Sequence, residues 1–176
     1  MTGALVALRW SELCAIKRDD VDLPARTIRV DESLTELGGR LLWGRPKTPA
    51  ARRTNDLPDT VRRVLAEHLL AFPPLRDQDD PRWDGLVFYG PGNSPVYRKT
   101  FARAWSEACS AAGVGHVRAE WLRHTGASLV YRETRDLKQV AAMLGHTTTR
   151  MGDENYVQRY ATTSREAADA IDALFR

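Results

Sequence analysis

The sequence has few cysteines and no long apolar run. Only Cys14 and Cys109 occur among 176 residues, and they do not have the spacing of metal ligands, so buried free thiols in a reducing compartment are expected. No stretch reaches the roughly 20 apolar residues that a membrane-spanning helix needs. The apolar start, residues 1–8, lacks the basic lead of a secretory signal. We therefore expect a cytoplasmic protein without a membrane partner.

A strong excess of one charge is also missing. The chain holds 26 basic and 23 acidic residues, a net charge of +3. The distribution is uneven, however, because basic residues crowd the first third and an acidic stretch occupies 77–84. Clustered arginine and lysine suit an anionic polymer such as DNA. Composition alone favours the simpler interpretation of a solvated, mixed-charge surface.

The length fits one domain, and a hydrophobic content of 43% is enough for a sizeable core. Apolar periodicity and capping residues predict an α+β domain that is mostly helical, with a small three-stranded antiparallel sheet near the N-terminus. Lys47 is expected in the loop after the second strand. The predicted helices are 4–17, 58–71, 98–112, 121–132, 137–144 and a last one that begins at 163–166, and the predicted strands are 27–30, 41–43 and 53–57, with a turn at 38–39. Helix 58–71 is expected to bury Val61, Val64, Leu65 and Leu69, and helix 98–112 is expected to bury Phe101, Ala104, Trp105 and Ala108 before Gly113 ends it. Asp136 is expected to cap helix 137–144, and Trp43, Trp105 and Trp121 are expected in the core.

Several widely spaced residues together indicate phosphodiester chemistry without a metal. Arginine binds two phosphate oxygens at once and keeps its charge, which suits Arg9 and Arg123 to a crowded phosphorane. A lysine such as Lys47 can protonate a leaving oxygen, and a tyrosine can act as nucleophile where nearby cations favour its ionised form. Each residue alone is more often a surface charge or a packing group. Only their order and spacing favour a catalytic set.

Four segments resemble the motifs of the tyrosine recombinases of the phage integrase type. These are 9–13 (Arg-Trp-Ser-Glu-Leu), the hairpin segment 44–58, 122–128 (Leu-Arg-His-Thr-Gly-Ala-Ser) and 143–146 (Met-Leu-Gly-His). The resemblance implies a catalytic fold that spans residues 1–176. It implies that Arg9 and Arg123 bind the scissile phosphate, that Glu12 is a buried supporting acid and that Lys47 is the general acid. It also implies that His146 donates a hydrogen bond to the phosphate.

The nucleophile is a choice between two tyrosines. Family spacing from the Gly-His pair selects Tyr156, ten residues after His146, and Tyr160 lies one helical turn further on. We predict that Tyr156 attacks the phosphate and forms a 3′-phosphotyrosine. The alternative, Tyr160, stays open.

Glu120 departs from the family pattern. Relatives usually carry a histidine three residues before the second arginine, whereas this chain has Glu120 before Arg123. A carboxylate would repel the phosphate unless burial keeps it protonated. Glu120 is therefore treated as a site residue whose effect on catalysis must be determined.

The resemblance implies a site-specific DNA recombinase that needs no cofactor, binds double-stranded DNA and acts as a homo-tetramer on paired sites. It also implies that an N-terminal core-binding domain is absent from residues 1–176. Two alternatives remain: a degenerate, non-cleaving DNA-binding remnant of an integrase, and a type IB topoisomerase. The hairpin and the Leu-Gly-His segment favour the integrase over the topoisomerase. The catalytic side is expected to carry a basic surface built from Arg9, Lys47, Arg52, Arg53 and Arg123.

Overall fold

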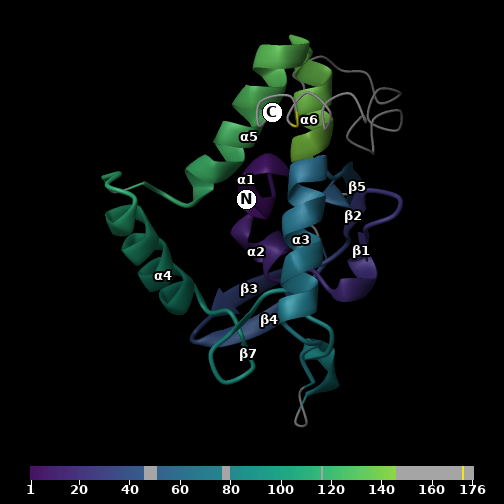
Figure 1. Cartoon of the computed structure of the whole chain (residues 1–176). Helices are drawn as coiled ribbons and strands as arrows, with labels where there is room; N and C mark the ends of the chain where they lie inside the picture. The colour runs from purple at the N-terminus through teal and green to yellow at the C-terminus, as the bar shows by residue number, and fades with distance from the viewer. Residues whose placement is uncertain (46–50, 77–79, 116, 146–171, 173–176) are drawn as a thin grey trace.

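The computed structural model describes residues 1–45, 51–76, 80–115, 117–145 and 172. Helices and small antiparallel sheets surround one main core (Figure 1). Within the described part, no helix is long and apolar enough to cross a membrane. The described helices are α1 (Thr2–Leu5), α2 (Trp10–Leu13), α3 (Asp59–Ala71), α4 (Arg98–Ala111), α5 (Glu120–Thr134) and α6 (Leu137–Leu144), with 3-10 turns at Arg18–Asp20 and Pro81–Trp83.

The N-terminal segment is not the single helix that periodicity predicted over 4–17. It forms α1 and α2, separated by a break in which Ala7 has φ of +53°. The carbonyls at the break accept hydrogen bonds from distant side chains instead of from a continuing helix. Asn55 Nδ2 donates to Val6 O at 3.0 Å, and Arg123 Nη1 donates to Ala7 O at 2.7 Å. Tertiary bonds therefore replace the helical ones, and local sequence could not reveal this.

The three-stranded antiparallel sheet exists, but its membership differs from the prediction. Its order is β1 (Val21–Asp22), β2 (Thr27–Val30), β5 (Arg53–Asp56). The predicted strand at 41–43 lies instead in β4 (Arg40–Gly44), which pairs with β3 (Ser33–Leu37) as a separate hairpin. Gly38 and Gly39 both have positive φ, so a tight turn closes the hairpin locally. A short pair, β6 (Tyr89–Gly90) and β7 (Ser94–Pro95), completes the described strands.

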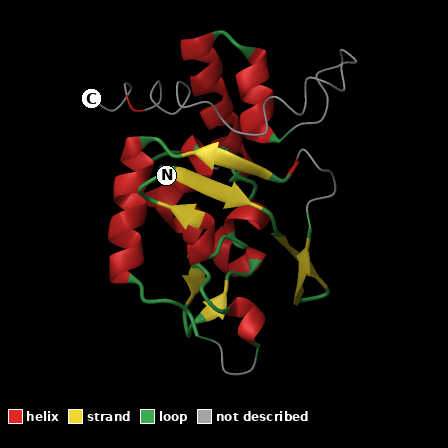
Figure 2. Cartoon of the chain, turned by 90° about the vertical axis from the view of Figure 1, so that its right-hand side faces the viewer, coloured by secondary structure: helices red, strands yellow, loops and turns green. Residues whose placement is uncertain are grey.

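Helix α3 covers one side of the three-stranded sheet, and the hairpin stands apart from that sheet (Figure 2). Ile28 and Val30 of β2 and Val61 and Leu65 of α3 are fully or almost fully buried in the core. The apolar face predicted for 58–71 is confirmed at these α3 positions. It is wrong for Val64, which is 40% exposed.

Helices α5 and α6 close the core from the other end, and α5 packs directly on α1 (Figure 1). Gly126 makes this close approach possible, because a Cβ at this position would lie 2.0 Å from the carbonyl oxygen of Ala4. Asp136 caps α6 by accepting a hydrogen bond from Lys138 N at 2.7 Å, as predicted. Both helices therefore begin within a residue of their predicted positions.

Helix α4 matches its predicted bounds to within one residue but is less buried than predicted. Ala104 and Ala108, expected to point inward, are exposed, and only Cys109 is buried along the helix. The helix stands beside the main core (Figure 1), so a narrow strip of its surface is covered. Cys14 and Cys109 are buried free thiols, as expected. Burial raises the pKa of the Cys14 thiol to about 12.

The predicted C-terminal helix lies outside the described residues except for Asp172, which is helical and buried. The Asp172 carboxylate accepts hydrogen bonds from the backbone N–H groups of Asp59, at 2.5 Å, and Thr60, at 2.8 Å. It also pairs with Arg26 at 3.1 Å. Asp172 thus caps the first turn of α3, where a negative charge is favourable.

Candidate active site

Arg9 is the N-cap residue of α2, and its side chain is 44% exposed. Its backbone N–H donates to Glu12 Oε2 at 2.8 Å, and its Nη1 donates to Glu12 Oε1 at 2.7 Å. The helix start and the carboxylate together hold the guanidinium at the protein surface. An exposed arginine in a fixed position is suited to binding a phosphate.

Glu12 lies behind Arg9 and is only 3% exposed. Burial alone would raise the pKa of its carboxyl. The hydrogen bonds and charge of Arg53, together with the backbone and side-chain hydrogen bonds of Arg9, outweigh burial and lower this pKa to about 2. Glu12 is therefore an ionised acid at neutral pH, enclosed by arginines.

Arg53, at the start of β5, is the arginine that holds Glu12 most fully. Its Nη1 and Nη2 donate to the two carboxylate oxygens at 3.2 and 2.9 Å. Its Nε donates to Met143 O at 3.0 Å, and Nη1 also donates to Ala51 O at 3.1 Å. Only 1% of the side chain is exposed. The prediction that Arg53 forms part of a DNA-facing basic surface is therefore wrong.

The reason lies in the alternation of side chains along β5. Residues 53, 55 and 57 share one face, and Arg53, Asn55 and Leu57 are all buried. Asn55 Nδ2 donates to Val6 O and, at 3.2 Å, to Met143 O. Since Leu57 is an apolar residue at the end of the predicted strand, its face was the available signal that Arg53 and Asn55 point inward.

Arg123 lies on α5 and is also buried, with 10% of its side chain exposed. Nη1 donates to Ala7 O at 2.7 Å, and Nη2 donates to Leu144 O at 2.5 Å. Its Nη1 lies 3.6 Å from Glu12 Oε2. Burial, aided by the charges of Arg9 and Arg53 and opposed by Glu12, lowers the pKa of Arg123 to about 10. The guanidinium thus stays charged at neutral pH.

The structure therefore brings together Arg9, Glu12 and Arg123 from distant parts of the sequence, with Arg53 as an additional member. We call these four residues the arginine cluster. Lys47, His146, Tyr156 and the alternative Tyr160 lie outside the described residues. Two carbonyls that border those ranges belong to the cluster's contacts: Ala51, after the range that holds Lys47, and Leu144, shortly before His146.

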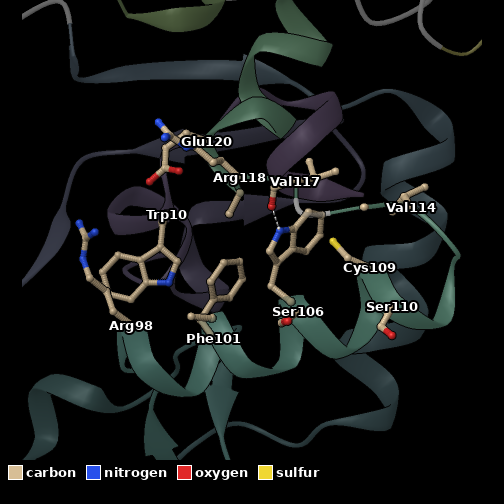
Figure 3. Close-up of a pocket in the computed structure, with 14 residues that line it drawn as sticks. Trp10, Arg98, Phe101, Ser106, Cys109, Ser110, Val114, Val117, Arg118 and Glu120 are labelled. Carbon is tan, nitrogen blue, oxygen red and sulfur yellow. Dashed lines mark hydrogen bonds between the residues drawn. The ribbon is translucent and has the colours of Figure 1, made fainter.

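Glu120, the first residue of α5, is exposed. The burial that the sequence left open for this side chain is therefore not observed. The side chain lines a hollow of about 580 Å³, together with Arg118 and, across it, Trp10 and Arg98 (Figure 3). With respect to the residues that the structure describes, Glu120 makes no hydrogen bond or ion pair.

Aromatic side chains form much of this hollow. Phe101 and Trp105, one turn apart on α4, lie nearly parallel with ring centroids 6.4 Å apart. Trp105 Nε1 donates to Val117 O at 2.7 Å, and the guanidinium of Arg98 lies 4.9 Å from the Trp10 ring centre (Figure 3). Trp105 is half-buried. Trp121, expected in the core, is 54% exposed.

Comparison with known proteins identifies a family. The model of the phage integrase family matches residues 4–163. The integrase of Mycobacterium phage D29 is 26% identical over 173 residues, 97% of this chain and 45% of that protein. Tyrosine recombinase XerC of Stutzerimonas stutzeri is 33% identical over 143 residues, 79% of this chain and 40% of that protein. The chain thus spans less than half the length of these relatives.

A solved structure has the same fold. The Tn1549 transposon integrase, in complex with a circular intermediate DNA, aligns with a TM-score of 0.73 at 16% identity, covering 99% of this chain and 56% of that one. The α+β class is therefore confirmed as that of the tyrosine recombinase catalytic fold. With a family match over most of its length, the chain belongs to the phage integrase family of tyrosine recombinases.

Proposed function

We propose that this chain is the catalytic domain, over residues 1–176, of a site-specific DNA recombinase that integrates DNA through a covalent 3′-phosphotyrosine intermediate. It acts on double-stranded DNA in the cytoplasm, as a homo-tetramer on paired sites. The observation that carries the proposal is the convergence of Arg9 and Arg123 on Glu12 in a member of this family. Two cations supported by one buried acid suit the doubly charged phosphorane of strand cleavage.

The roles follow from the chemistry of each side chain. Tyr156 gives up its hydroxyl proton to solvent and its oxygen attacks the phosphorus. A P–O bond to tyrosine forms, and the bond to the 5′ oxygen breaks. Lys47 gives a proton to that oxygen, while Arg9, Arg123 and His146 bind the phosphate oxygens. The phosphotyrosine keeps the bond energy, so that a 5′ hydroxyl can reverse the step on a new strand without a nucleotide cofactor.

The test is covalent capture on DNA. The substrate is a pool of nicked duplexes with randomised sequence around a fixed nick. Cleavage near the nick releases a short fragment that carries the 5′ hydroxyl. The strand then cannot be rejoined, and the protein stays attached to the DNA. The native chain should give an adduct that survives denaturing electrophoresis. Tyr156→Phe should abolish the adduct and retain DNA binding, whereas Tyr160→Phe should keep both.

Two results would contradict parts of the proposal. Loss of the adduct with Tyr160→Phe but not with Tyr156→Phe would assign the nucleophile to Tyr160. A native chain that binds DNA but forms no adduct with any member of the pool would favour the non-cleaving remnant. The exposed carboxylate of Glu120 is the observation that favours this second function.

A further inference from the structure

The arginine cluster holds three guanidinium groups but one carboxylate. Glu12 is the acid that pairs with Arg9, Arg53 and Arg123. Arg53 takes both oxygens in a two-pronged contact, whereas Arg123 Nη1 stays 3.6 Å away, beyond good hydrogen-bond range. Arg9 Nη1 also donates to Glu12 Oε1, at 2.7 Å. Glu12 is therefore shared by Arg53 and Arg9, and Arg123 is the arginine of the cluster that lies furthest from it.

This inequality has a consequence for the two phosphate-binding candidates. An ion pair in a buried setting is strong, and a carboxylate without Arg53 would attract its remaining neighbours. Arg123 would then exchange its bonds to Ala7 O and Leu144 O for a close pair with Glu12. Arg9 would be held more tightly as well. Both groups would be less available to an incoming phosphate.

Arg53 also connects segments that flank the rest of the site. Its Nε donates to Met143 O, close to the end of α6, and its Nη1 donates to Ala51 O. The same guanidinium thus contacts Glu12 and the backbone of both segments. A single-pointed cation such as lysine could not make these contacts together, because they use the planar fork of arginine.

We propose that Arg53 is a positioning residue for DNA cleavage: it occupies Glu12 and thereby keeps the guanidinium groups of Arg9 and Arg123 available to the scissile phosphate. This inference rests on the proposed function. Arg53 itself does not touch DNA, since its side chain is 1% exposed. Its influence passes through Arg9, Arg123 and the Met143 and Ala51 carbonyls.

The test is a double-mutant cycle on DNA affinity, which does not depend on cleavage. Arg9→Gln, Arg53→Met and the double variant are compared with the native chain by fluorescence anisotropy on a short duplex. Arg9→Gln should weaken binding about tenfold, as expected for one lost charge-assisted hydrogen bond. Arg53→Met should weaken binding to a similar extent although it is buried. The double variant should be no weaker than Arg53→Met alone, because the loss of Arg53 already impairs Arg9.

A second measurement separates positioning from binding. At saturating DNA, adduct formation by Arg53→Met should be about 100-fold slower than by the native chain, because small misplacement of catalytic groups is costly. Arg53→Lys keeps a charge but not the fork, and should show the same direction of change in both affinity and rate. The Lys variant also serves if Arg53→Met does not fold, which thermal unfolding will reveal.

The matched control is Arg29→Met, on the neighbouring strand β2. Arg29 is an exposed arginine paired with Asp20 and Asp31 on the outer face. Arg29→Met should leave DNA affinity and the rate of adduct formation unchanged. It should also leave unchanged the loss of affinity that Arg9→Gln causes. Additive effects of Arg9→Gln and Arg53→Met, or native affinity and rate in a folded Arg53→Lys, would overturn the inference. If the effects on affinity are non-additive but the chain forms no adduct, the positioning role of Arg53 would stand and the proposed cleavage activity would be contradicted.

Discussion

The arginine cluster differs in its charge arrangement from the edge of the α4 hollow at Glu120, which we call the rim. In the cluster, Glu12, Arg53 and Arg123 are buried, and Glu12 is bound by Arg53 of β5 and by Arg9, the N-cap residue of α2. At the rim, Glu120 is exposed beside a hollow under α4, a helix that contributes one buried residue. Long-range contacts hold the first region together, so we expect it to tolerate little change. We expect the charge of the second region to be changeable without disturbing the fold.

The largest effect is expected from removing the acid of the cluster. Glu12→Gln leaves Arg53 buried without its counter-charge, so the free energy of unfolding should fall by about 3–5 kcal/mol. Urea denaturation measures this change. Glu120→Gln is the matched control, and it should stay within about 0.5 kcal/mol of the native chain. Equal losses in the two variants would remove the distinction between the regions.

Lowering the pH should also weaken the arginine cluster, because it protonates Glu12. Folding lowers the pKa of Glu12 from 4.5 to about 2, so its stabilisation is complete above pH 4.5 and declines as the pH falls towards 2. From pH 6 to pH 3 this group should cost about 2 kcal/mol of stability.

Urea unfolding at both pH values, in the native chain and in Glu12→Gln, isolates that contribution from those of other carboxyls. The native chain should lose more stability than the variant. A parallel decline in both proteins would show that Glu12 does not carry the effect.

These two predictions depend on contacts that the sequence revealed only in part. The bounds of α4, α5 and α6 could be predicted because their signals are local, such as the Asp136 cap and the glycine at 113. The break at Ala7 could not, since it depends on a side chain far away in the sequence. Neither could the contacts that join Arg53 to Glu12 and Met143. Charge suggested a surface position for Arg53, whereas strand alternation places it inside.

The candidate site likewise combines residues that the sequence identified with contacts that it did not. Resemblance named Arg9, Glu12 and Arg123, and the structure places these three together. It did not indicate that Arg123 would be bound by backbone carbonyls of both Ala7 and Leu144. Such contacts depend on how α1, α5 and α6 pack, which no short motif encodes.

At the rim, restoring the usual family residue should accelerate the reaction. Under the proposed function, Glu120→His removes a negative charge near the scissile phosphate and supplies a group that can move a proton. Adduct formation should be about tenfold faster, less than for a buried catalytic group because solvent screens an exposed charge. Single-turnover assays on the nicked substrate measure the rate.

Glu120→Gln separates the two contributions, since it removes the charge alone and should recover part of the gain. An unchanged or lower rate for Glu120→His would mean that this glutamate is compatible with catalysis as it stands.

The smallest effect is expected at an arginine adjacent to the cluster but outside it. Arg52 has a side chain that is 54% exposed and lies 3.5 Å from Asp31. Arg52→Gln should leave stability within about 0.5 kcal/mol. It should reduce the slope of log affinity against log salt by about 1, as expected for one lost phosphate contact. Titrations at several salt concentrations test this, and an unchanged slope would place Arg52 away from DNA.

The break between α1 and α2 also determines when the site can assemble during synthesis of the chain. Arg123 is bound to Ala7 and Leu144, and Asn55 to Val6 and Met143. These hydrogen bonds, which we call the clamp, join segments that are far apart in the sequence and are therefore synthesised at different times. Closing such long loops is slow and cannot precede the arrival of the last segment. Under the proposed function, a growing chain has no assembled clamp until Leu144 has left the ribosome. Under that function, an unfinished chain would be unable to cleave DNA.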